Sequence, residues 1–183
     1  AVLARIAIAT AIAAALGALI ALPDRAEGAV LLIFGLAQLA RMAGWKSRAA
    51  ARQPLLGALH LAMAMTGLGA LAGGLALCGI GSEIGALHVT AIGGVGGMTL
   101  AMMSRASLGH SGRPLVAPRG VALGYALLPL AAGLRWLGST SLALYYPAAI
   151  GSAVIWALAF ALYLVAMWPA LWQPRLPRAE APA

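Results

Sequence analysis

The sequence predicts an all-α, polytopic membrane protein with about six transmembrane helices, short loops and both termini in the cytoplasm. Of its 183 residues, 63% are hydrophobic and only 9% are charged, and its mean hydropathy is +0.95. A soluble domain carries about 25% charged residues. This chain has too little polar surface to cover a globule in water, and its apolar stretches of about 20 residues are long enough to cross a bilayer.

Six apolar segments predict the helices, and Gly, Pro and charged residues separate them. Pro23 and Asp24 end the first segment, which is too long for the core of a signal peptide. Pro54 suits the first position of the third helix, and the sixth segment is long enough to tilt. Loops this short make consecutive helices antiparallel neighbours. The expected helices cover residues 2–22, 28–44, 54–77, 84–108, 119–137 and 141–171.

These helices form one expected transmembrane domain, residues 1–172, followed by a flexible cytoplasmic tail, residues 173–183, that is rich in Pro and Ala. The chain begins without a methionine, so we expect it to be part of a longer membrane protein. Its uneven charge distribution sets the expected orientation, because basic residues mark the cytoplasmic face. The side with both termini carries ten of the twelve basic residues: Arg5, Arg41, Lys46, Arg48, Arg52, Arg105, Arg113, Arg119, Arg175 and Arg178.

Several function classes are excluded by composition. The net charge of +8 does not indicate nucleic-acid binding, because the basic residues lie between membrane segments. The single cysteine, Cys78, allows no disulfide within the chain and no CxxC or CxxCH motif. Four acidic residues, all in loops or the tail, do not provide a Ser-His-Asp set.

Three histidines are the candidate metal ligands: His60, His88 and His110. Polar groups inside an apolar segment are costly, so they mark candidate functional sites, and neutral imidazole is a common metal ligand. In a continuous helix His88 and His110 would be about 33 Å apart, too far to share one metal. His60 and His110 are expected in the same half of the membrane and could share a site. A histidine that merely hydrogen-bonds to a neighbouring helix is the alternative for each.

Two arginines and a run of glycines accompany these histidines. Arg105 and Arg113 flank His110, where their guanidinium groups could pair with haem propionates or lipid phosphates. The alternative is that they only mark the cytoplasmic side of the membrane. The four glycines of the segment IGGVGG at residues 92–97 either allow close helix packing or leave room for a flat cofactor such as a porphyrin. The sequence leaves both alternatives open.

A family resemblance rests on three stretches. ALHVTAIGGVGGMTLAMMSRASLGHSGRPL is the most specific, and RMAGWKSRAAARQPLLGALHLAMAM and the ending MWPALWQPRLPRAEAPA support it. Together they resemble the NnrS family of bacterial membrane proteins, which is linked to nitric oxide and reported to contain haem and copper. The resemblance covers residues 28–178. Members of that family have about twice as many spanning helices, so it implies that this chain is the C-terminal half and that an N-terminal half is its missing partner.

The resemblance implies a multi-pass protein of the bacterial inner membrane that binds haem and copper and acts in the response to nitric oxide or nitrosative stress. His60, His88, His110, Arg105 and Arg113 match the family pattern as cofactor-binding residues, and the three histidines as metal ligands. The expected partners are membrane lipids, haem, copper and nitric oxide. The resemblance implies no defined reaction. Two other functions stay open: a transporter or channel that relays protons or a solute through the histidines, and a structural membrane subunit.

Overall fold

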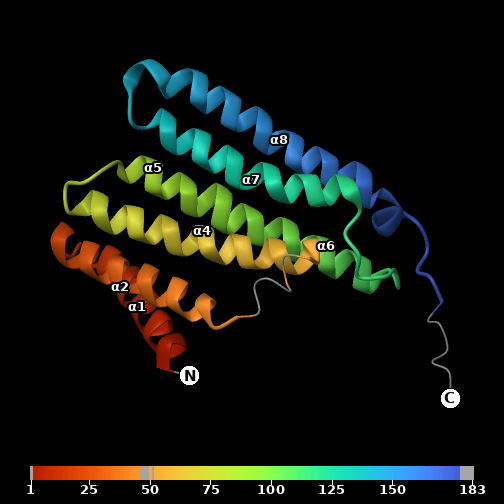
Figure 1. The fold of residues 1–183 in the computed structure, drawn as a ribbon, viewed down its shortest axis with the longest axis horizontal. Coiled ribbons are helices and arrows are strands. Elements are labelled where there is room, and N and C mark those ends of the chain that lie inside the picture. Colours follow the sequence, from red (N-terminus) through yellow and green to blue (C-terminus); the bar gives the residue numbers. More distant parts are fainter. Residues whose placement is uncertain (1, 46–49, 51, 178–183) are drawn as a thin grey trace.

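The computed structural model describes residues 2–45, 50 and 52–177, and in this part of the chain every regular element is helical (Figure 1). Six helices are long and apolar enough to cross a membrane, which confirms the predicted fold class. The fourth span, Glu83–His110, comprises three consecutive elements. The elements are α1 (Val2–Leu19), α2 (Asp24–Ala43), α4 (Pro54–Leu77), α5 (Glu83–His88), η1 (Val89–Gly96), α6 (Gly97–His110), α7 (Arg119–Gly138) and α8 (Leu142–Trp172).

The largest boundary differences lie at the first loop. Helix α1 ends at Leu19 rather than residue 22, because Ala21 adopts a positive φ of 51° and the Leu22 amide bonds back to the Gly17 carbonyl at 2.9 Å. Helix α2 begins at Asp24 rather than residue 28. Its first turn contains Asp24 and Glu27, whose negative charge is favourable at the positive end of the helix dipole. The other helices begin and end within a turn of the expected residues.

The fourth span also differs from the continuous α-helix that the sequence predicts. Its middle, Val89–Gly96, winds as a π-helix of eight residues, and it begins directly after His88. π-Helical turns are rare and are found disproportionately at functional sites. The span that carries two of the three histidines is therefore also the one with irregular winding.

The helices are arranged in sequence order across the bundle (Figure 1). Helices α1 and α2 lie on one side and α7 and α8 on the other, with α4 and the α5–η1–α6 span between them. Helix α4 contacts α2, the fourth span and α7. A side chain on α4 can therefore face either α2 or the fourth span, and this choice decides the surroundings of His60.

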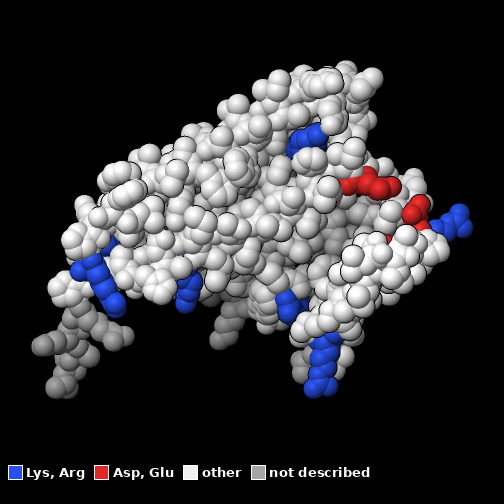
Figure 2. All heavy atoms as spheres, turned by 180° about the vertical axis from the view of Figure 1, so that it is seen from behind, with Lys and Arg blue, Asp and Glu red and all other residues white. Residues whose placement is uncertain are grey.

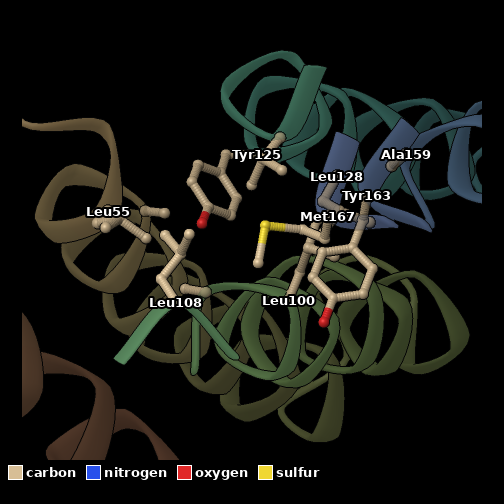
Figure 3. Packing of buried hydrophobic residues seen from close by; sticks show 11 residues of the cluster. Leu55, Leu100, Leu108, Tyr125, Leu128, Ala159, Tyr163 and Met167 are labelled. Atoms are coloured by element: carbon tan, nitrogen blue, oxygen red, sulfur yellow. The ribbon is translucent and has the colours of Figure 1, made fainter. Parts of the chain in front are cut away.

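A hydrophobic cluster joins α4, α6, α7 and α8 (Figure 3). Its centre includes Leu100, Leu128, Ala159, Tyr163 and Met167, which are at most 1% exposed. In a membrane such clusters hold helices together through van der Waals packing, because lipid tails are as apolar as the side chains. This cluster fixes α6 against the C-terminal helix pair.

Basic and acidic side chains occupy different parts of the surface (Figure 2). The described Arg side chains gather mainly along one edge, whereas the described Asp and Glu side chains lie near the opposite end, as the loop charges predict. Lys46, Arg48 and Arg178 lie outside the described residues, as does most of the predicted tail. The cytoplasmic orientation of the termini stays a prediction.

Candidate cofactor-binding residues

His60 lies six residues into α4, half-buried, on the side that faces α2. Its Nδ1 atom is 2.9 Å from the carbonyl oxygen of Leu56, one turn earlier. The indole ring of Trp45, just beyond α2, meets the imidazole edge-on with ring centroids 5.0 Å apart and planes at 85°. The His60 ring is thus oriented by its own helix and by a neighbouring aromatic side chain.

His88 makes the same backbone contact at the opposite end of the bundle. Its Nδ1 atom is 2.6 Å from the carbonyl oxygen of Ile84. A carbonyl oxygen can only accept a hydrogen bond, so in each neutral imidazole the proton resides on Nδ1. The Nε2 lone pairs of His60 and His88 are therefore left free. Metal-binding histidines commonly have this arrangement, in which one ring nitrogen donates to a carbonyl and the other binds the metal.

A buried polar group that sequence reasoning did not single out lies between α2 and α4, the two helices that also surround His60. Gln38 of α2 is only 2% exposed; it accepts a 2.8 Å hydrogen bond from Arg41 and donates to the Met63 sulfur at 3.7 Å. The Arg41 guanidinium lies 5.4 Å from the centre of the Trp45 ring, and its Nε is buried without a hydrogen-bond partner in the described chain. The sequence does contain a signal for this group, because a glutamine inside an apolar membrane segment is energetically costly.

His110 is exposed at the end of α6, in different surroundings. It shares a shallow hollow of about 400 Å³ with Met102, Arg105 and Leu115. Arg113 does not line this hollow. Its Nη2 donates a 2.9 Å hydrogen bond to Gln173, which ties the turn after α6 to the end of α8.

The structure does not bring the three histidines together. Among the described residues, no group of three His, Cys, Asp or Glu side chains could hold a metal ion. His60 faces α2, whereas its helix neighbours Ala58 and Ala62 face the hydrophobic cluster and α6. Within the described residues, each histidine could therefore contribute only a single ligand to a metal, and no complete copper site is formed.

Comparison with known proteins decides the family. A family model described as NnrS protein matches residues 1–175. The chain belongs to the NnrS family. No curated protein and no solved structure matches it. The long apolar helices and this family membership together identify a multi-pass membrane protein.

Two glycines of the 92–97 run in this NnrS chain, Gly93 and Gly94, serve close packing, which is one of the two alternatives. A Cβ atom at Gly93 would lie 2.6 Å from the Met65 side chain, and one at Gly94 would lie 2.6 Å from the Thr66 hydroxyl group. These distances are too short for two non-bonded atoms, so both glycines let η1 lie directly against α4. The space beside them is filled by side chains of α4 and offers no room for a flat cofactor.

An apolar hollow of about 310 Å³ instead opens between α2, α4 and the start of the fourth span of the NnrS chain. Leu31, Phe34, Gly69, Gly73 and Thr90 contribute to its walls. It lies at the level of the apolar segments rather than among the basic loops. His60 and His88 are not among the residues that line it.

Proposed function

We propose that this NnrS-family membrane protein binds haem at one of two separate intramembrane histidines, His60 or His88, carries copper as a second metal and acts in the response to nitric oxide. The observation that supports haem binding is the shared geometry of the two histidines. In both, the Nδ1 hydrogen bond to a helix carbonyl leaves Nε2 as a free base inside an apolar span. The role in nitric oxide metabolism comes from family membership.

His60 has the more developed surroundings of the two. Its ring is held edge-on by Trp45, and the cationic Arg41 lies over that indole. A guanidinium close to a histidine ligand would offset the negative charge of an acidic cofactor group. Gln38 fixes Arg41 by a hydrogen bond within the membrane-spanning part of α2. Trp45 thus orients the His60 ring, and Arg41 adds a positive charge on that same indole.

His110 and Arg105 form the third candidate, at the rim of the bundle. The exposed hollow that they share suits the carboxylates of a cofactor or a lipid headgroup better than a buried metal. Arg113 would support this region indirectly, through its hydrogen bond to Gln173. Haem iron, when bound, supplies the site at which a diatomic gas such as nitric oxide coordinates.

The test is an absorption spectrum of the purified protein, with metal analysis of the same sample. We expect a haem Soret band that shifts when nitric oxide is added, and a loss of haem in His60→Ala or His88→Ala. His110→Ala provides a comparison at an exposed position and should retain most of the haem. Wild-type haem content in both His60→Ala and His88→Ala would refute the assignment. Copper analysis of the same variants tests the second metal separately.

A further inference from the structure

Arg135 is the one charged side chain that is buried among the described residues, at 8% exposed. It lies on α7, three residues before the helix ends at Gly138. Its guanidinium group rests on the ring of Tyr145, 4.6 Å from the ring centre. Helix α8 begins at Leu142, so both residues lie about 5 Å inside the helix ends at 1.5 Å per residue.

The described part of the chain leaves this charge without an anionic partner. The Nη1 atom is buried and makes no hydrogen bond there. Glu83, Asp24 and Glu27, the acidic residues in the loops at this end, form no ion pair with it within that part of the structure. A buried charge without a partner is strongly destabilising, and the Tyr145 face offsets only part of that cost, because a cation–π contact is weaker than a hydrogen-bonded pairing with an anion.

We propose that Arg135 and Tyr145 form a binding site for a phosphate-type oxyanion, where α7 passes to α8. The planar guanidinium presents a fork of N–H donors that matches two oxygens of a phosphate group. The contact with Tyr145 engages the face of the guanidinium, and its Nη1 has no hydrogen-bond acceptor among the described residues. The depth of about 5 Å corresponds to the interface between the hydrocarbon and headgroup layers. An anionic phospholipid headgroup and a free inorganic anion share the required chemistry.

The first experiment measures protection of Arg135 from phenylglyoxal, a reagent that modifies arginine, in the purified wild-type protein. Peptide mass spectrometry reads the modification at Arg135 and at Arg25, which is exposed in the first turn of α2. We expect phosphatidylglycerol to slow modification of Arg135 at least fivefold relative to Arg25. Protection by inorganic phosphate in lipid-free detergent would identify a free anion as a sufficient ligand. No protection of Arg135 by either anion would overturn the proposal.

The second experiment uses native mass spectrometry of variants after exchange into phosphatidylglycerol or phosphatidylcholine. Arg135→Gln should lose the tightly retained phosphatidylglycerol, whereas Arg25→Gln should keep it. Arg135→Lys, which keeps the charge without the fork, should retain less lipid than the wild-type protein. Folded Arg135→Gln that retains wild-type amounts of phosphatidylglycerol would contradict the proposal. If that variant does not fold, the protection measurement on the wild-type protein decides the question.

Discussion

The close approach of α4 to the π-helix depends on Gly69. A Cβ atom added there would clash with the Thr90 hydroxyl group and would lie 2.8 Å from the Thr90 backbone nitrogen and 3.1 Å from its Cα. Rotation of a side chain cannot relieve contacts with backbone atoms, so Gly69→Ala must push η1 away from α4. Overpacking of this kind costs about 1–3 kcal/mol. We expect a loss of about 2 kcal/mol, roughly 30-fold in the folding equilibrium.

Gly73→Ala is the matched control, one turn further along the same helix. Its added Cβ would lie 3.6 Å from a Leu31 methyl group and 3.8 Å from the Ala86 Cβ, which are ordinary van der Waals distances. Both substitutions gain the same intrinsic helix preference of alanine over glycine, so their difference isolates the clash. The assay is reversible unfolding in mixed detergent, followed by circular dichroism. Equal stability of the two variants would refute the packing argument.

Three further predictions concern other contacts. Ser152→Ala removes the 2.8 Å hydrogen bond from α8 to the Ala131 carbonyl and should cost about 0.6–1.7 kcal/mol in the same unfolding assay. Thr10→Ala, whose hydroxyl group donates to carbonyl oxygens of its own helix, should cost less. Leu100→Ala, at a fully buried position, should cost about 2–5 kcal/mol, and a cost no larger than that of exposed Met102→Ala would contradict the assigned core. Gly112 has a φ of +71° and supports the Leu176–Ser111 backbone bond of 2.9 Å, so Gly112→Ala should speed tryptic cleavage after Arg175, whereas Gly109→Ala in α6 should not.

The sequence predicts most of the fold because hydropathy directly determines which segments enter a membrane. Every expected span is present, and the third, Pro54–Leu77, has the predicted bounds. The sequence predicts the end of α1 and the start of α2, on either side of the first loop, less accurately. The sequence pattern places Asp24 and Glu27 in that loop, whereas in the structure they lie in the first turn of α2. Acidic residues that follow a proline are compatible with a loop and also with the first turn of a helix.

The candidate site is less predictable, because it depends on which face of a helix meets which neighbour. The sequence indicates that His60 and His110 lie in the same half of the membrane, but His60 faces α2 and His110 is exposed. The role of Gln38 depends on its contact with Met63 of the neighbouring α4 and on its hydrogen bond with Arg41 of its own helix. The π-helix has no clear sequence signal, since its departure from the α-helical period lasts only eight residues. The haem, copper and orientation assignments stay predictions.

The π-helix also sets the rotational phase between the two halves of the fourth span. A π-turn holds one residue more than an α-turn, and each residue of an α-helix advances the direction of the side chains by roughly 100°. The faces of α5 and α6 are therefore offset from those of an uninterrupted α-helix. The inward positions of Leu100, Ser104 and Leu108 exist only with this offset. Winding the same eight residues as an ordinary α-helix would therefore turn the core face of α6 away from the bundle, whereas an α-helix shorter by one residue between Val89 and Gly96 would keep that face close to its present direction.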